Sequence, residues 1–151
     1  MTYVIQLVVA VFATISFAVI FSVPRRDLIL CGISGGLTWL VYFVLTANGM
    51  GNVFASLIAT FILTIMARVL AVTRKNPATV YLLTGIFPLV PGAGIYYTAY
   101  YLIQNDRDMF GRTGLNTFEV AAAIVFGIIF GFSIPQRLFN YFGSKKDSLG
   151  N

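Results

Sequence analysis

The sequence of 151 residues contains no histidine, one cysteine and few charged side chains. Without histidine, and with Cys31 as the single thiol, one chain can assemble neither a disulfide framework nor a Cys/His metal site. Charged residues are 10% of the chain, which is too little polar surface to cover a soluble globule. Paired carboxylates, a nucleophile beside a base and a phosphate-binding loop are also missing, so the sequence indicates neither an enzyme nor a cofactor.

Long apolar runs dominate the sequence instead. Hydrophobic residues make up 58% of the chain and the mean hydropathy is +0.87, values that predict an integral membrane protein. The net charge of +5 does not indicate a nucleic-acid partner, because the Lys and Arg residues lie in short groups between apolar runs. The first run, residues 4–23, lacks a basic start and ends in Pro-Arg-Arg, which argues against a removable signal peptide.

We predict an all-α, polytopic membrane helix bundle, with residues 1–151 forming a single integral membrane domain. A helix of about 20 residues rises about 30 Å, which matches the hydrocarbon core of a bilayer. By this measure the chain has transmembrane helices at residues 4–23, 28–47, 53–72, 78–103 and 118–134, followed by a tail at 135–151. Residues 105–116 are expected to form a polar connection before the last helix.

The fourth span, residues 78–103, cannot be one straight helix. Pro88 and Pro91 lack an N–H group and clash with the preceding turn, while Gly92 and Gly94 can take the φ values that a broken backbone needs. The segment is too long for one straight crossing and too short for two. At membrane depth a break is tolerated only where it is buried in protein or lines a wet cavity. We therefore expect the functional centre at Pro88–Gly94.

The basic residues separate into two groups if the broken span crosses the membrane once. One side then holds only Arg107 and Arg112, and the other holds Arg25, Arg26, Arg74, Lys75, Arg137, Lys145 and Lys146. Because basic residues are enriched on the cytoplasmic side, this pattern predicts an N-terminus outside and a C-terminus inside the cell.

Hydroxylated and small residues recur every four positions in the first three spans, which keeps them near one helix face. Thr38, Thr60 and Thr64 are therefore candidates for lining a transport pathway, and the alternative is close packing between helices. Arg68 lies just inside the third span. Its guanidinium can snorkel to the interface or offer a bidentate fork to a substrate carboxylate.

Three segments together resemble the membrane half of the bacterial threonine/serine exporter family. They are Gly35-Gly-Leu-Thr-Trp39, Arg74-Lys-Asn-Pro77 and, most specifically, Pro88-Leu-Val-Pro-Gly-Ala-Gly-Ile-Tyr96. The chain looks like the short, membrane-only subunit of the two-subunit form. That resemblance implies a larger partner subunit with a second membrane domain and a cytoplasmic domain. It also implies location in the bacterial inner membrane and export of threonine and serine, or of a dicarboxylate such as succinate.

One mechanism agrees with both the broken helix and the resemblance. A small carboxylated metabolite would bind at the break, where the N–H groups near Ala93 present the positive end of a half-helix dipole. The candidate substrate-binding residues are Arg68, Pro88, Pro91, Gly92, Ala93, Gly94 and Tyr96, with no metal ligand among them. Five spans provide few helices to enclose a transport pathway, so we expect a partner subunit, a homo-oligomer, or both. The alternative is a membrane subunit that anchors or stabilises its partner without transporting.

Overall fold

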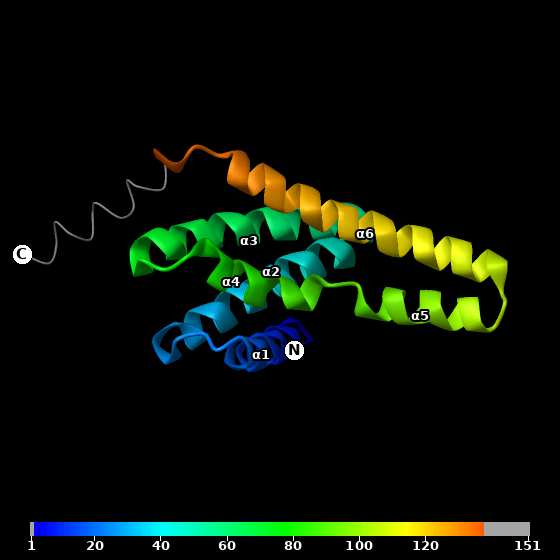
Figure 1. The fold of residues 1–151 in the computed structure, drawn as a ribbon, viewed down its shortest axis with the longest axis horizontal. Coiled ribbons are helices and arrows are strands. Elements are labelled where there is room, and N and C mark those ends of the chain that lie inside the picture. Colours follow the sequence, from blue (N-terminus) through cyan, green and yellow to red (C-terminus); the bar gives the residue numbers. More distant parts are fainter. Residues whose placement is uncertain (1, 138–151) are drawn as a thin grey trace, which may run out of the picture.

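A computed structural model of the chain describes residues 2–137, and within this range it contains helices and no strand (Figure 1). This confirms the predicted all-α class. The longer helices are α1 (Thr2–Ile20), α2 (Leu28–Ala47), α3 (Asn52–Arg74), α4 (Ala78–Ile86), α5 (Gly92–Ile103) and α6 (Arg107–Ser133), and two short 3₁₀ helices are η1 (Arg25–Asp27) and η2 (Phe87–Leu89).

Helices α1, α2, α3 and α6 are each long and apolar enough to cross a membrane. Helix α4 with η2 forms one half of a broken span and α5 forms the other half, at an angle of 53° to it. The described chain therefore has four candidate crossings, or five if the bent pair crosses once. This result confirms the predicted polytopic bundle with an interrupted fourth helix.

The last helix begins well before the predicted span. Residues 105–116 were expected to be a polar connection, but α6 is helical from Arg107 onward. Its start is set by Asp106, whose side chain accepts a hydrogen bond of 3.1 Å from the backbone N–H of Met109. Such an N-cap replaces one of the acceptors missing at a helix start. Hydropathy alone does not detect it, because the cap precedes polar helical turns.

Helix α3 lies at the centre of the bundle and packs against α2, α4 and α6, while α1 packs mainly against α2. Close packing of α3 with α6 depends on glycines: a Cβ atom at Gly127 would lie 2.7 Å from Leu57 O and 2.9 Å from Thr60 Cβ. Gly131 faces Thr64 in the same way. Small residues at such contacts allow the backbones of membrane helices to approach closely.

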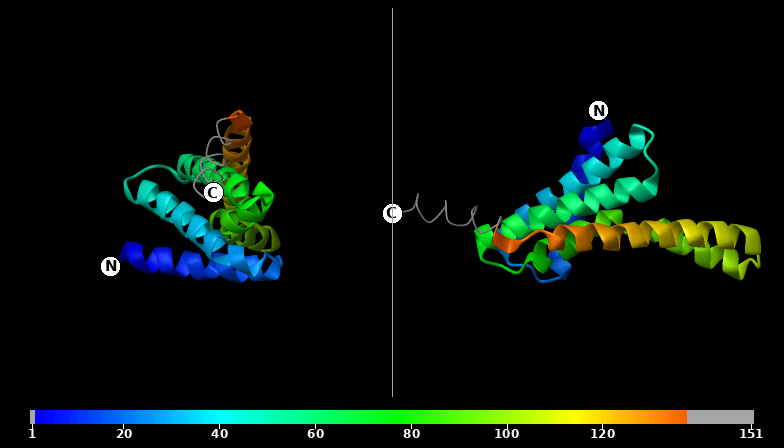
Figure 2. Two further views of the ribbon diagram at one scale, coloured as in Figure 1. Left: turned by 90° about the vertical axis from the view of Figure 1, so that its left-hand side faces the viewer. Right: turned by 90° about the horizontal axis from the view of Figure 1, so that it is seen from above.

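Helix α5 and the first half of α6 form an arm that projects from the rest of the bundle (Figures 1 and 2). The main neighbour of α5 is α6, and α5 has no buried residue. The α1–α2 corner, the α3–α4 corner and the end of α6 all lie toward the opposite end of the molecule (Figure 1). The basic residues Arg25, Arg26, Arg74 and Lys75 lie at those two corners, whereas Arg107 and Arg112 lie on the arm; Lys145 and Lys146 fall outside the described residues.

Candidate functional site

The break leaves backbone donors without acceptors. Pro91 is the N-cap residue of α5, with φ −75° and ψ 59°, and its side chain caps no N–H group. The N–H of Gly92 turns back to the carbonyl of Val90 at 2.7 Å. Among the residues that the structure describes, the N–H groups of Ala93 and Gly94 have no hydrogen-bond acceptor. Two donors at the positive end of the α5 dipole are thus available to an external acceptor.

The break also leaves backbone acceptors without donors. In a continuous helix the carbonyls of Pro88 and Leu89 would receive the N–H groups of Gly92 and Ala93. Neither carbonyl accepts a backbone hydrogen bond within residues 2–137. The same segment therefore carries two backbone donors and two backbone acceptors without a backbone partner among the described residues.

These groups line a cavity of about 310 Å³ between α2, α3, η2, α5 and α6, which we call the break cavity. Its volume lies at the lower end of the range of small-molecule sites. Among residues 2–137, no charged side chain lines it. The lining residues are Trp39, Tyr42, Asn52, Ser56, Pro88, Leu89, Val90, Pro91, Gly92, Ala93, Gly94, Asn116, Thr117 and Val120.

One lining side chain is both buried and without a partner. Ser56 is 1% exposed, and in the described part of the chain its Oγ is the buried side-chain polar atom for which no hydrogen-bond partner is found. A buried hydroxyl group without a partner costs about 1 to 3 kcal/mol relative to a paired one. The cavity wall formed by α3 therefore holds an unused hydrogen-bonding group.

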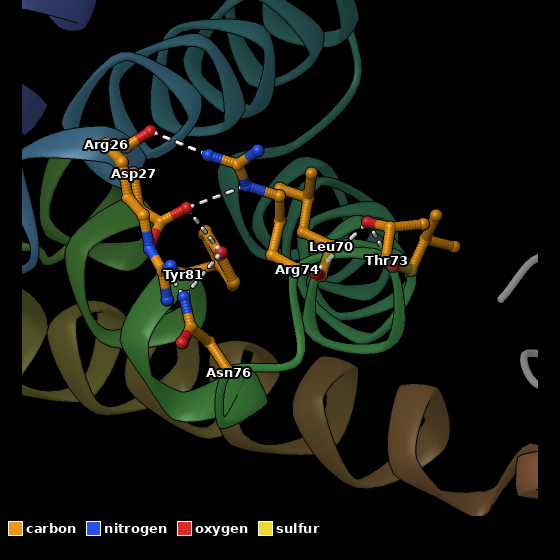
Figure 3. Close-up of polar contacts among 8 residues, drawn as sticks. Arg26, Asp27, Leu70, Thr73, Arg74, Asn76 and Tyr81 are labelled. Carbon is orange, nitrogen blue, oxygen red and sulfur yellow. Dashed lines mark hydrogen bonds and ion pairs between the residues drawn. The ribbon is translucent and has the colours of Figure 1, made fainter. Parts of the chain in front are cut away.

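A second polar cluster, centred on Asp27, ties two corners of the bundle together (Figure 3). The Asp27 side chain is completely buried and accepts hydrogen bonds from Arg74 Nε at 2.9 Å, Asn76 Nδ2 at 2.6 Å and Tyr81 OH at 3.1 Å. Arg26 Nε lies 3.4 Å from the same carboxylate, and Arg26 O accepts from Arg74 at 2.9 Å. The cluster fixes the start of α4, and through α4 the position of the break.

Comparison with known proteins places the chain in a family. The family model described as Threonine/Serine exporter, ThrE matches residues 6–134. The chain belongs to the threonine/serine exporter family. A protein of Mycobacterium tuberculosis described as a probable threonine/serine exporter is 31% identical over 109 residues, which cover 72% of this chain and 21% of that protein.

An uncharacterized protein of Haemophilus influenzae is 25% identical over 134 residues, which cover 86% of this chain and 45% of that protein. The chain thus spans about a fifth of the first relative and under half of the second. No solved structure matches the chain.

In this member of the threonine/serine exporter family, the predicted substrate-binding residues divide into two groups. Pro88, Pro91, Gly92, Ala93 and Gly94 all line the break cavity. Arg68 and Tyr96 are absent from its lining. Tyr96 is 64% exposed on the arm and stacks with Tyr100, with ring centroids 6.5 Å apart.

Arg68 belongs to α3, and its side chain contacts the C-terminal end of α6. Its Nη1 donates to the carbonyls of Gly131 at 2.8 Å and Ile134 at 2.6 Å, and its Nη2 donates to Gln136 Oε1 at 2.7 Å. The side chain is buried among protein atoms and is not open to solvent. The guanidinium instead occupies the carbonyl end of a helix, where a positive charge is favourable. Contact of Arg68 with substrate stays a prediction.

The three threonines predicted to line a pathway are completely buried. Each donates its hydroxyl to the carbonyl four residues earlier: Thr38 to Ser34 at 2.7 Å, Thr60 to Ser56 at 2.7 Å and Thr64 to Thr60 at 2.8 Å. None of them lines the break cavity. Their positions in the bundle agree with helix packing, and a pathway role for them stays a prediction.

The two glycines at the break do not use the positive φ values that glycine can adopt. Neither Gly92 nor Gly94 has a positive φ; among the described glycines Gly49 alone does. Gly94 is needed for space instead, because a Cβ atom there would overlap the side chain of Thr117 on α6. A Cβ atom at Gly92 would meet no atom within 4 Å.

This contrast predicts different effects for the same substitution at the two glycines. We expect Gly94→Ala to cost about 1 to 3 kcal/mol of stability, because overpacking forces α5 away from α6. Gly92→Ala should leave the melting temperature in detergent unchanged or slightly raised. Adding Thr117→Ala should restore most of the loss in Gly94→Ala, and a Gly94→Ala variant as stable as the unmodified protein would contradict this account.

Several site residues could not be found from sequence patterns. Trp39 and the Arg74-Lys-Asn-Pro77 motif carry part of the resemblance to the family, but the sequence does not show what they contact. In the structure Trp39 lines the cavity, and Arg74 and Asn76 donate hydrogen bonds to Asp27. Asp27 directly follows the Pro-Arg-Arg sequence that ends the first apolar run. The available signal was a carboxylate at the edge of an apolar run, which requires a partner when it is buried.

Proposed function

We propose that this chain is the membrane subunit of a secondary exporter for small carboxylated metabolites, with threonine and serine as its substrates. The observation that carries the proposal is the pair of unoccupied N–H groups at Ala93 and Gly94, at the start of a half-helix and facing a cavity. Helix N-termini of this kind bind carboxylates in broken membrane helices. Membership in the threonine/serine exporter family supports the same substrates.

The lining of the break cavity favours an amino acid over a dicarboxylate such as succinate. A zwitterion has no net charge, and the break offers donors for its carboxylate and the carbonyls of Pro88 and Leu89 for its ammonium group. Trp39 and Tyr42 add aromatic rings, which attract cations. A dicarboxylate would bring a second negative charge into a cavity to which the described residues contribute no cationic side chain, which is costly away from water.

We propose that the chain works with a larger subunit of the same family that carries a cytoplasmic domain, and that it forms oligomers. The relatives are much longer than the segment they share with this chain, so in them the module is joined to further sequence. We place the protein in the bacterial inner membrane with its N-terminus outside and C-terminus inside, following the charge pattern.

The proposal is tested by blocking the cavity without disturbing the fold. Gly92→Leu should reduce efflux of labelled threonine at least tenfold in the native host, where any partner is present, because the new side chain enters the open space beside the α5 N-terminus. Gly51→Leu is the matched control: Gly51 is equally open, but it does not line the cavity, and efflux should persist.

The alternative function, a membrane anchor, makes the opposite prediction. An anchor needs its surface but not its cavity, so Gly92→Leu would leave efflux unchanged while deletion of the chain abolishes it. Unchanged efflux in Gly92→Leu, at normal abundance in the membrane, would therefore replace the transport proposal with the anchor.

A further inference from the structure

The Ser56 hydroxyl departs from the hydrogen-bonding pattern of the other hydroxyls on its helix. Thr60, Thr64 and Thr73 of α3 each donate to the carbonyl four residues earlier, at 2.7 to 3.0 Å. Serine and threonine commonly make this bond in membrane helices, because it satisfies the donor within the helix itself. Ser56 makes no such bond to Asn52, although it is buried to nearly the same degree as Thr60 and Thr64.

The cavity explains where a partner for Ser56 would come from. Ser56 and Asn52 are consecutive turns of α3 on the cavity wall, and Thr117 and Asn116 of α6 contribute to the same lining. Thr117 is already committed, since its hydroxyl donates to Thr113 O at 2.7 Å. The Ser56 hydroxyl is therefore the buried side-chain group that retains both a donor and an acceptor for a bound molecule.

We propose that Ser56 recognises the hydroxyl group of the transported amino acid. The proposal rests on the proposed function and extends it from a carboxylate site to a site for β-hydroxy amino acids. The substrate carboxylate would occupy the N–H groups of Ala93 and Gly94, while its side-chain hydroxyl bonds Ser56 Oγ. A hydroxyl is well suited to this position, because each of two hydroxyls can donate to or accept from the other.

The consequence is discrimination against analogues that lack the hydroxyl. Alanine in place of serine, or 2-aminobutyrate in place of threonine, fills the cavity but leaves Ser56 unpaired. A site that is built to hydrogen-bond a substrate hydroxyl rejects the analogue without it, because the buried polar group of the site then remains unsatisfied. For one neutral hydrogen bond we expect the hydroxylated substrate to be preferred over its analogue by about tenfold or more.

The test compares pairs of substrates in one protein. Native-host cells that carry either the unmodified chain or Ser56→Ala are loaded with labelled threonine and 2-aminobutyrate, and the two efflux rates are measured together. The unmodified chain should export threonine at least tenfold faster, and Ser56→Ala should bring the ratio close to one while 2-aminobutyrate efflux persists. Ser56→Ala removes a hydroxyl that has no protein partner, so its melting temperature in detergent should not fall.

Ser34→Ala is the matched control. Ser34 is also 1% exposed, but its hydroxyl donates to Cys31 O at 2.9 Å and it does not line the break cavity. This variant should keep the threonine preference. An unchanged ratio in Ser56→Ala, or no preference in the unmodified chain, would overturn the role of Ser56 while leaving export intact. Loss of efflux for both substrates from the unmodified chain would overturn the proposed function and the Ser56 proposal with it.

Discussion

Replacing Asp27 with alanine is expected to lower the melting temperature of the protein in detergent by roughly 10 °C. The carboxylate is completely buried and accepts hydrogen bonds from Arg74, Asn76 and Tyr81, so its removal takes away an acceptor from all three. The loss of an acceptor costs about 1 to 3 kcal/mol for a buried donor such as the Tyr81 hydroxyl, and less for the Arg74 guanidinium, which is 32% exposed. In a chain of this size each kcal/mol shifts the melting temperature by about 2 to 4 °C.

Two comparisons separate this effect from a general loss of negative charge. Asp108→Ala removes an exposed aspartate from the first turn of α6 and should change the melting temperature only slightly. In an Arg74→Met background, Asp27→Ala should lower the melting temperature by less than it does alone. The reason is that the cluster then contains no cation that has lost its carboxylate. Equal losses from Asp27→Ala in both backgrounds would show that the ion pair does not stabilise the fold.

The Asp27 cluster also bears on transport, although it does not line the break cavity. It joins η1, which precedes α2, to the end of α3 and the first turns of α4. Helix α4 carries η2 and Pro88 to the cavity wall. Asp27 is thus a positioning residue for the break, and we expect its loss to reduce transport in proportion to the loss of folded protein.

The helix break was predictable because proline acts through its own covalent structure. Pro91 has no N–H group wherever it stands, so the interruption near it follows from the sequence. The role of Gly94 did not follow, because what a glycine makes room for depends on a neighbour, here Thr117, that only the packing of α5 on α6 brings close. Backbone chemistry is local, whereas the use of space is a property of the assembled helices.

The polar partners were not predictable for the same reason. Asp27 binds Arg74 and Tyr81, which lie 47 and 54 positions later in the chain. Ser56, Thr60 and Thr64 form one repeat in the sequence, yet Thr60 and Thr64 bond their own helix and pack on α6 while Ser56 lines a cavity without a partner. The Arg68 fork was expected to bind a substrate carboxylate, and that contact stays a prediction. The acceptors that the structure provides are carbonyls of α6.

Replacing both Pro88 and Pro91 with alanine is expected to separate stability from transport. Pro88 stands in the first turn of η2, where a missing N–H costs little, so most of the effect should come from Pro91 at the start of α5. A proline within a helix costs about 3 kcal/mol relative to alanine, so the segment should become more continuous and the melting temperature in detergent should stay the same or rise.

Transport should fall because a continuous helix uses the groups on which the proposed site depends. The N–H groups of Ala93 and Gly94 would bond the carbonyls of Leu89 and Val90, and the dipole end at membrane depth would disappear. Losing charge-assisted hydrogen bonds to a carboxylate costs about 1.5 to 3 kcal/mol, so we expect efflux below about a tenth of the unmodified level. The measurement is the efflux of labelled threonine from native-host cells that carry the double variant.

Pro77 provides the control, because it is the N-cap residue of α4 just as Pro91 is the N-cap residue of α5. Pro77→Ala makes the same chemical change at a helix start that does not line the break cavity, so efflux should persist. If the double variant is stable and exports threonine at the full rate, the prolines serve only to bend the span by 53° so that α5 can pack on α6. The carboxylate would then have to bind elsewhere, because no free N–H pair would remain at the break.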